Sequence, residues 1–472
     1  MLPSIDVLRH TLAGVIQHKA EQGHLTEGLQ TRLEALPDHY DDLHAFALEL
    51  EHLPQRQDWP YVEPEDWADI LAECDPERAD DPVEVPCHAD RVETAFLSRV
   101  AGCMLGKPLE ISPTFDEILN ALEPIGDWPL RDYVSEKAAA GFARGLHHCW
   151  RTTTREHQRY VTNDDDMNYA IIGLLVLEKH GVAFIRDHLR SEWMGQLPLS
   201  ETFGPERLIL ALSGLDSFKS GGWRPEWVSR YNPREEYCGA LIRADAYGWA
   251  CAGRPGLAAR LAWKDAGFTH RRTGVYGSMF VAAALAAAPG ADTPMAVFET
   301  ALQYVPRRSR FAEAVRHAMT AVAGSGDWIE AYQRIHSQYR DFGHCRVFQE
   351  IGTLVNTLCH AESIGDGICK QVMQGNDTDS FGATAGSLLG MYFGPGHLEE
   401  RWITPFNDEL RLALAQFWEP SLQAVARRAA ALPDRVAADL RNGISPDPIS
   451  PDRPPSATDA DTGVVAKSNC RG

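Results

Sequence analysis

The chain has 472 residues, of which 44% are hydrophobic and 24% charged, a composition typical of a soluble globular protein. Its formal net charge of −21 repels a phosphate backbone, which argues against nucleic acid as a general partner. A small phosphorylated ligand is still compatible with this charge, because backbone N–H groups at helix ends act locally. The length fits one large core with an appendage as well as two or three equal domains.

The first residues do not resemble a signal peptide, because charged residues such as Asp6, Arg9 and Lys19 interrupt the apolar positions. The longest apolar runs, residues 170–177 and 280–289, are shorter than the roughly 20 residues that a bilayer-spanning helix needs. The ten cysteines include no CxxC pair and are typical of reduced, buried thiols. We therefore expect a cytoplasmic protein with no membrane partner.

The N-terminal part predicts a short helical extension. Apolar residues recur there at helical spacing in two groups: Leu8, Leu12, Val15 and Ile16, then Leu25, Leu29 and Leu33. Residues 53–64 contain three prolines and predict an extended segment rather than a helix. Residues 74–90 are rich in Asp and Pro and mark a boundary, so we assign the extension to residues 1–90.

From Val92 onward the helical period dominates, and the alternation typical of strands is nearly absent. We expect helices at residues 92–105, 167–180, 237–252, 257–265, 275–288, 295–304, 311–323, 328–339, 347–362, 380–393 and 400–417. The pattern predicts an all-α protein, with a compact multi-helix domain over residues 91–441. Residues 442–472 contain five prolines among Ser and Asp, which predicts a disordered tail.

Three adjacent acids, Asp164, Asp165 and Asp166, directly precede the apolar run 170–177. The simplest interpretation is a helix cap, because carboxylates accept from free N–H groups and complement the helix dipole. Adjacent carboxylates also repel one another unless a cation collects them, and hard cations such as Mg²⁺ prefer oxygen ligands. The pattern alone leaves both interpretations open.

A second acidic loop has the sequence Gly-Asn-Asp-Thr-Asp-Ser over residues 375–380. The helix expected after it carries Gly382, Gly386 and Gly390 at intervals of four, which gives that helix a flat face for close packing. A polar turn before a tightly packed helix would explain this string on its own. Two acidic helix starts in one helical chain, however, could together supply the oxygen ligands of a two-metal site.

A third string, residues 102–110, reads Gly-Cys-Met-Leu-Gly-Lys-Pro-Leu-Glu. A helix of small residues is expected to end at Gly106, because Pro108 prevents its continuation. Glu110 then projects from a constrained loop, which is the rigid placement that a general acid or base needs. A solvated glutamate after a helix is the structural alternative.

These three strings resemble, in order and character, the motifs of the ADP-ribosylglycohydrolase family, which includes the dinitrogenase reductase-activating glycohydrolases. Residues 102–110 resemble its G-D-A-L-G-x-P-x-E pattern, residues 163–166 its T-D-D-T helix start, and residues 375–380 its G-G-D-x-D-T loop. Residues 239–243 resemble its G-x-x-x-R segment, which contacts the distal part of the ligand. Thr269 and His270, followed by residues 274–277, resemble its S/T-H stretch. The resemblance covers roughly residues 92–417.

The resemblance implies a compact helical bundle that binds two Mg²⁺ ions, or Mn²⁺, and hydrolyses the anomeric bond of ADP-ribose. The partner would be an ADP-ribosylated protein or small-molecule acceptor. Carried over to this chain, the metal ligands would be Asp164, Asp165, Asp166, Asp377, Asp379 and Ser380. The catalytic residues would be Glu110, Asp165 and Asp379, and the substrate-binding residues would be Gly239, Arg243, His270, Gly274, Tyr276 and Gly277.

The chain also departs from the family pattern. Asn163 and Asp166 replace the two threonines of the first loop, so Asp166 could itself be a ligand, with Asp164 in the place of a threonine. Cys103 replaces an aspartate, and a thiol is a poor partner for Mg²⁺. For His270, a purely structural histidine is the alternative. Two other functions therefore stay open: an impaired relative that binds ADP-ribose or is structural, and a hydrolase of another ribosyl or phosphorylated small molecule.

Overall fold

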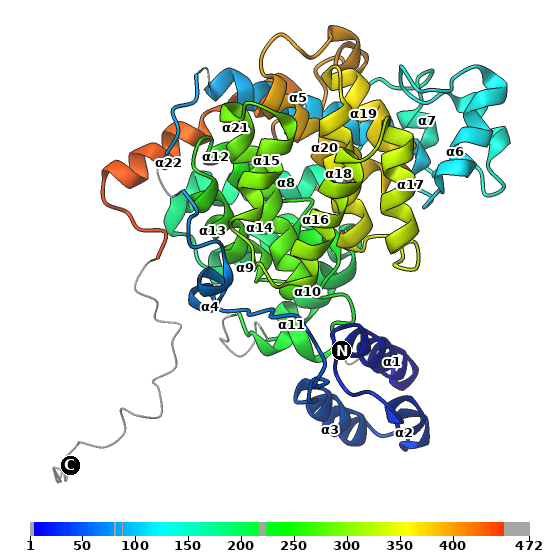
Figure 1. Cartoon of the computed structure of the whole chain (residues 1–472), viewed down its shortest axis with the longest axis vertical. Coiled ribbons are helices and arrows are strands. Elements are labelled where there is room, and N and C mark those ends of the chain that lie inside the picture. Colours follow the sequence, from blue (N-terminus) through cyan, green and yellow to red (C-terminus); the bar gives the residue numbers. More distant parts are fainter. Residues whose placement is uncertain (1–3, 80–81, 87, 217–222, 448–472) are drawn as a thin grey trace.

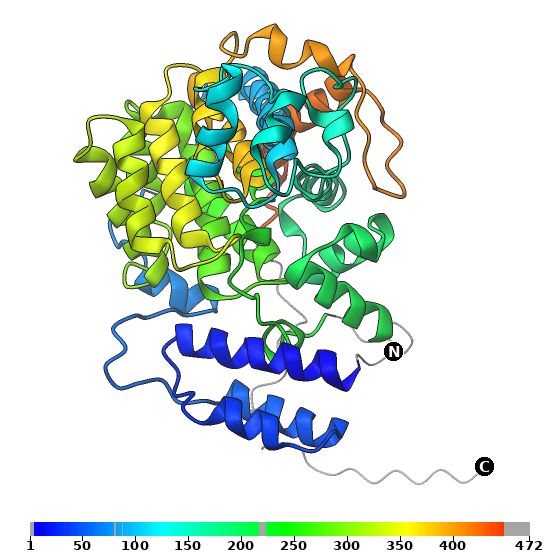
Figure 2. The same ribbon diagram turned by 90° about the vertical axis from the view of Figure 1, so that its right-hand side faces the viewer.

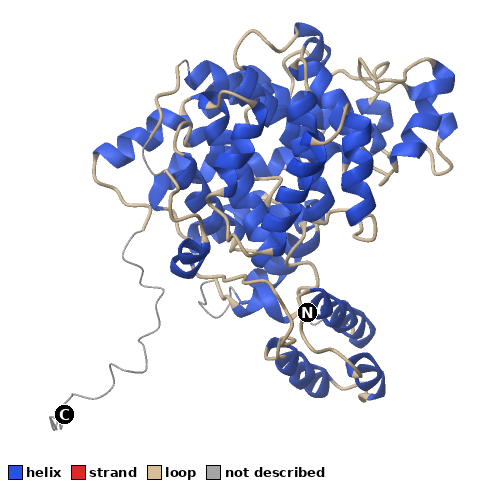
Figure 3. Ribbon diagram, viewed as in Figure 1, coloured by secondary structure: helices blue, strands red, loops and turns tan. Residues whose placement is uncertain are grey.

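A computed structural model describes residues 4–79, 82–86, 88–216 and 223–447, and over these residues its ribbon shows helices and loops but no strand (Figure 3). Over these residues the only β-type pairings are isolated bridges, such as that between Tyr237 and Arg346. The predicted all-α class is confirmed.

The helices follow one another along the chain, with long connections between α6 and α7 and between α20 and α21. The first eleven are α1 (Ile5–Glu21), α2 (Leu29–Ala35), α3 (Tyr40–Glu51), α4 (Trp67–Glu73), α5 (His88–Gly106), α6 (Phe115–Leu122), α7 (Trp150–Thr153), α8 (Asp165–His180), α9 (Arg186–Gln196), α10 (Gly204–Asp216) and α11 (Glu226–Arg230). The others are α12 (Asp245–Ala250), α13 (Pro255–Ala266), α14 (Arg272–Ala287), α15 (Pro294–Leu302), α16 (Arg310–Ala323), α17 (Trp328–Tyr339), α18 (Val347–His360), α19 (Ile364–Met373), α20 (Thr378–Phe393), α21 (Leu422–Ala430) and α22 (Leu432–Arg441).

The N-terminal helices α1, α2 and α3 enclose a small core of their own, which includes Leu12, Leu33 and Phe46. They lie at one end of the molecule, beneath the main helical body (Figures 1 and 2). Helix α4 instead contributes Ile70 to the main core. Only α1–α3 therefore form a separately packed unit within the predicted extension.

A buried ion-pair network joins the extension to the main body. The Arg310 guanidinium is 9% exposed and lies 2.7 Å from a Glu63 carboxylate oxygen and 2.6 Å from one of Glu236. The side-chain amide of Gln22 in the extension donates to Glu235 at 2.7 Å. Because such groups are costly to bury singly, their pairing fixes how the segments dock.

Helix α14 runs through the centre of the main body. The stretch 272–290 is long and apolar enough to cross a bilayer by those two criteria, but 83% of its apolar window is buried inside the fold. Ring stacking of Phe280 on Phe298 of α15 contributes to its surroundings. Its apolar character is that of a central core helix.

Two expected helices are wrong. Residues 237–252 form a short 3₁₀ turn at Cys238–Ala240 and the separate helix α12. The break is stabilised by arginine side chains, because the carbonyl of Ile242 accepts from Arg99 at 2.7 Å and that of Gly239 from Arg243 at 3.1 Å. Guanidinium groups thus satisfy these carbonyls, rather than the hydrogen bonds of a continuous helix.

Residues 400–417 also do not form one helix. They contain two 3₁₀ turns, Glu400–Trp402 and Thr404–Phe406, and then an irregular segment. Pro405 lacks the N–H that a helix interior needs, and Asn407 and Asp408 adopt positive φ angles of 52° and 58°. The segment folds back so that the Leu410 amide donates to the Pro420 carbonyl.

The predicted tail is described only in its first six residues, 442–447. There the Pro446 carbonyl accepts from the Lys264 ammonium at 2.9 Å, and Asp447 pairs with Arg260. Residues 448–472 lie outside the described residues, so the disordered tail stays a prediction.

Candidate active site

The close pairing of α5 and α20 brings two of the predicted strings together. A Cβ added at Gly102 would lie 1.9 Å from the Gly382 carbonyl oxygen, and one at Gly386 would lie 2.1 Å from that of Ser98. The two helices run antiparallel in backbone contact, so the end of α5 meets the start of α20. There the Thr378 hydroxyl donates to the Gly106 carbonyl at 2.9 Å. The predicted flat glycine face of α20 exists, and it places the loop carrying Glu110 beside the second acidic loop.

The first acidic loop caps α8 as well as forming an acidic cluster. The Oδ1 of Asp164 accepts from the amide of Asp166 at 2.8 Å, so Asp164 is the N-cap residue. Asp165 is half-buried, whereas Asp166 is fully buried. Burial raises the pKa of Asp165 and Asp166 well above the usual range, and the charge of Asp164 adds to this. The capping interpretation holds for one acid and leaves two without that function.

The second acidic loop turns sharply into α20. Gly375 has φ +81°, and a Cβ there would lie 2.5 Å from the Pro113 carbonyl oxygen, so the loop requires glycine. The hydroxyl of Ser380 donates to Oδ2 of Asp166 at 3.1 Å, which links the two acidic loops directly. Burial, followed by the charge of Asp379, raises the pKa of Asp377.

A lysine lies between the loops. The Nζ of Lys107 is 2.6 Å from Oδ2 of Asp164, 3.0 Å from Oδ2 of Asp379 and 2.5 Å from Oε2 of Glu110. Burial would lower the pKa of this ammonium, but Asp164 and Asp379 outweigh burial and raise the pKa well above its usual range. Burial would also raise the pKa of Asp379, but Lys107 overrides burial and holds it below its ordinary value. A permanent positive charge therefore lies among three carboxylates.

Glu110 is the most accessible carboxylate beside this lysine, with a side chain that is 30% exposed. Besides Lys107, its Oε2 faces Nε2 of His147 at 3.6 Å. Burial, and then the charge of Asp379, raises the pKa of Glu110. Burial, and then Lys107, lowers the pKa of His147 to about 4, so this imidazole is neutral at ordinary pH. Glu110 thus has the position and environment of a carboxyl group that can carry a proton.

Arg99 supports the first loop from beneath. Its buried guanidinium donates to the Asp166 carbonyl at 2.8 Å and to the Asp245 carboxylate at 2.8 Å. Nη2 also lies 3.8 Å from Oδ1 of Asp166. Arg99 therefore holds the first turn of α8 against α12 and α5 without reaching solvent.

Two thiols line the other side of the second loop. The Sγ atoms of Cys238 and Cys345 lie 3.5 Å and 3.4 Å from Oδ2 of Asp377. Cys103, at the position of the family's aspartate, is fully buried and lies near Asp164 and Asp166. Burial raises the pKa of Cys103 and keeps it a neutral thiol.

The donor atoms fit a hard divalent cation in part. Oδ1 of Asp166 and Oδ1 of Asp379 are buried and have no hydrogen-bond partner among the described residues. Carboxylate and hydroxyl oxygens of Asp165, Asp377 and Ser380 lie on the same two loops. Buried anionic oxygens without donors are the environment in which a cation is favourable. The nearest cation to Oδ1 of Asp166 is Arg99 at 3.8 Å, whereas the oxygens that face Lys107 have a cation at 2.5 to 3.0 Å.

Five of the six predicted substrate-binding residues are buried, and Gly239 is half-buried. Arg243 pairs with Glu206 and Asp265 at 2.5 Å each. His270 is fully buried, and its Nδ1 lies 2.7 Å from the Thr269 hydroxyl. The hydroxyl of Tyr276 donates to the Pro64 carbonyl.

The three predicted glycines are also closely packed. A Cβ would lie 2.7 Å from Glu206 Oε1 at Gly239, 2.8 Å from the Glu235 carbonyl at Gly274, and 3.1 Å from Leu241 at Gly277. Contact of these six residues with substrate stays a prediction.

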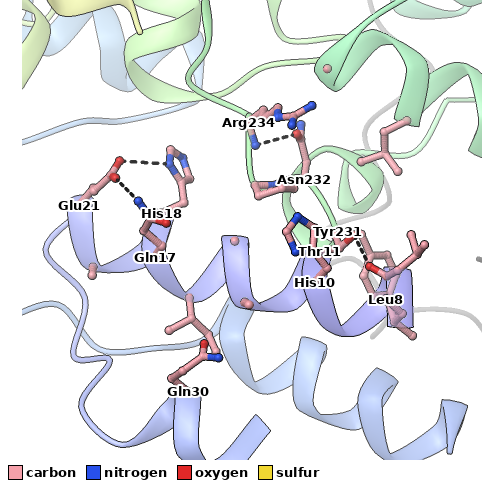
Figure 4. A pocket seen from close by; sticks show the side chains of 18 of the residues that line it. Leu8, His10, Thr11, Gln17, His18, Glu21, Gln30, Tyr231, Asn232 and Arg234 are labelled. Carbon is pink, nitrogen blue, oxygen red and sulfur yellow. Dashed lines mark hydrogen bonds and ion pairs between the residues drawn. The ribbon is translucent and has the colours of Figure 1, made fainter. Parts of the chain in front are cut away.

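A separate groove of about 1100 Å³ is lined by the N-terminal helices, mainly α1, and by residues of the main body that include Gly204, Leu208 and Tyr231. Figure 4 shows side chains of both parts facing it, among them His10 and Gln17 of α1 and Tyr231 of the body. None of the acidic-loop residues lines this groove. The chemistry is therefore assigned to the acidic loops, where the ionisable groups converge.

The acidic residues, Ser380 and Glu110 were found from sequence, and the structure brings them together. Lys107 and Arg99 were missed as members of the site. Lys107 lies inside the quoted third string, and a cation three residues before Glu110 was the available signal. Arg99 gave no comparable signal, because only the fold places it under α8.

The family model described as ADP-ribosylglycohydrolase matches residues 85–437. Among solved structures 45 chains match. One, described as an "ADP-ribosylglycohydrolase-related protein complex", is 18% identical with a TM-score of 0.49, and the match covers 74% of this chain and 99% of that one. No curated protein matches. Because the family model spans well over half of the 472 residues, including both acidic loops and Glu110, the chain belongs to the ADP-ribosylglycohydrolase family.

Proposed function

We propose that the protein is a divalent-metal-dependent hydrolase that cleaves the anomeric bond of ADP-ribose attached to a protein side chain or other acceptor, releasing ADP-ribose. Family membership supports a glycohydrolase. The observation that carries the finer proposal is the convergence of Glu110 with both acidic loops, since Lys107 lies 2.5 Å from Glu110 and within 3.0 Å of each loop.

The residues divide into two sets by chemistry. Asp165, Asp166, Asp377, Asp379 and Ser380 would hold Mg²⁺ or Mn²⁺ through oxygen atoms, as hard cations require. When bound, the ion would orient the ribose hydroxyls and polarise a water molecule. The surrounding carboxylates would stabilise the positive charge that develops at the anomeric carbon.

Glu110 would handle the proton. Its carboxyl group is partly exposed, whereas Asp166 and Asp379 are buried. A carboxyl group at the edge of the cluster can reach both a leaving group and a water without leaving its loop. Lys107 donates to Oε2 of Glu110, which also faces His147, so the proton would be carried on Oε1.

Hydrolysis assays with variants test this proposal. Glu110→Gln and Asp379→Ala should each lower kcat by at least about 100-fold, because each removes a group acting at the reacting centre. Glu123→Gln, at an exposed glutamate, is the control and should leave the rate unchanged. The substrates would be ADP-ribosylated arginine, serine and nucleobase. Unchanged hydrolysis by both site variants would show the assignment to be wrong.

A second candidate is a relative that binds ADP-ribose without turning it over. The specific observation in its favour is Lys107, which neutralises part of the acidic cluster, together with the thiol of Cys103 in place of a carboxylate. Calorimetry distinguishes the two functions. Binding of ADP-ribose with Mg²⁺ present, without turnover of any of the three substrates, would favour the binding protein. Turnover of free nucleotides only would favour another small-molecule hydrolase.

We place this activity in the cytoplasm. The eight described cysteines are all free, and most are buried, which supports a reducing compartment. Fluorescence microscopy of the tagged full chain in its own cells would test this placement.

A further inference from the structure

The Lys107 ammonium occupies a point where oxygens from three separate elements meet. Asp164 caps α8, Asp379 lies in the first turn of α20, and Glu110 ends the 3₁₀ turn Lys107–Leu109. All three contact distances fall between 2.5 and 3.0 Å, and the lysine side chain is 8% exposed. The contacts with Glu110 and Asp379 are charge-assisted hydrogen bonds, and the contact with Asp164 is a close ion pair.

The main chain fixes the origin of this side chain. Gly106 lies in backbone contact with Thr378, since an added Cβ would be 2.1 Å from the Thr378 carbonyl oxygen. Pro108 follows at the next position and restricts the backbone of Lys107. A rigid helix end thus positions the Lys107 ammonium among the carboxylates.

A lysine here and a metal ion on the same oxygens exclude each other. Mg²⁺ binds oxygen at about 2.0–2.1 Å and prefers nearly octahedral surroundings. An ion bound to Asp164 Oδ2, Asp379 Oδ2 and Glu110 Oε2 would lie almost where Nζ lies. Two cations at one point would also repel each other strongly at low dielectric.

Other oxygens of the two loops do not contact Lys107. Oδ1 of Asp379 and Oδ1 of Asp166 are buried without a hydrogen-bond partner among the described residues. Ser380 already links to Asp166 through its hydroxyl. Asp165 and Asp377 are the other acids of the two loops, and Lys107 forms no ion pair with either of them.

We propose that Lys107 is a built-in cation that replaces one of the two metal ions, so that this protein binds a single divalent ion, held by Asp166, Asp377, Asp379 and Ser380 with Asp165. This inference rests on the proposed metal-dependent function. It differs from the two-ion site expected from the family resemblance. The ammonium supplies one positive charge and hydrogen bonds, but no open coordination position.

The test counts bound metal in the absence of substrate. Full-length protein is stripped with EDTA and titrated with Mn²⁺, and the bound ions are counted by calorimetry and electron paramagnetic resonance. Wild type should bind one ion per chain with the spectrum of an isolated Mn²⁺. Lys107→Met should bind two, with the spectrum of a spin-coupled pair, because its side chain has similar length but no charge.

Controls separate the proposal from general effects. Lys179 pairs with Glu192 at 2.6 Å far from the acidic loops, so Lys179→Met should still bind one ion. If Lys107→Met does not fold, Lys107→Gln repeats the test with a neutral hydrogen-bond donor. Two ions in wild type, or none, would overturn the proposal, and so would a single ion in a folded Lys107 variant. Because no substrate is present, a failure of ADP-ribosyl hydrolysis does not change the count.

Discussion

Gly386 offers a direct test of how the α5–α20 contact positions the site. A Cβ at Gly386 would lie 2.1 Å from the carbonyl oxygen of Ser98 and 2.6 Å from its carbonyl carbon. Both are backbone atoms of α5 and cannot rotate away. In Gly386→Ala the two helices must therefore separate by about 1 Å, which would also draw Lys107 away from Asp379.

The expected magnitude follows from two opposing effects. Overpacking a close contact costs roughly 1–3 kcal/mol and occasionally more. Alanine is a better helix former than glycine, which stabilises the folded state by roughly 1 kcal/mol. Because the contact involves backbone on both sides, the cost lies near the upper end, and the net loss of stability should be about 2 kcal/mol.

The assay is thermal unfolding with a matched glycine. No atom lies within 4 Å of a Cβ added at Gly214 in α10, so Gly214→Ala should melt at or above wild type. Gly386→Ala should melt several degrees below wild type and bind Mn²⁺ more weakly. If Gly386→Ala is as stable as Gly214→Ala, the helices are not in backbone contact and the argument is refuted.

Three further measurements check other parts of the structure. Mg²⁺ added to stripped protein should raise Tm, since an ion that binds only the folded state stabilises it by about 2.7 kcal/mol at a hundred times its Kd; an unchanged Tm would contradict a metal site. Arg310→Met leaves Glu63 and Glu236 buried without their cation, so it should lower the free energy of unfolding in urea by about 3–5 kcal/mol. Arg308→Met, at the surface, should lower it little. Equal losses of stability in the two variants would contradict this. Burial lowers the pKa of Lys264 to about 7, against about 10.4 in the unfolded chain. Between these two pKa values the unfolded chain binds one proton more than the folded chain. Wild type should therefore gain stability relative to Lys264→Met as pH rises from 7 to 10. If Tm changes with pH in the same way in both proteins, the buried Lys264 does not have this effect.

Much of the fold was predictable because helical periodicity is a local property. The predicted helix at residues 328–339 has the same bounds in the structure, and the glycine face of α20 was read from its four-residue spacing. The expected helix over residues 237–252 was wrong for a non-local reason. Arg99, far away in the chain, holds the Ile242 carbonyl and stabilises a break there. No local pattern reports such a contact.

The sequence by itself determined the helical class, the two acidic loops and the place of Glu110 after a helix end. These features depend on residue type and short spacing, which the chain displays directly. The tertiary structure alone decided that Arg99 lies under the first turn of α8 and that Lys107 points among three carboxylates, one of them 272 residues away. Where a long side chain directs its charge depends on which helices pack beside it. Here a glycine contact between α5 and α20 sets that direction.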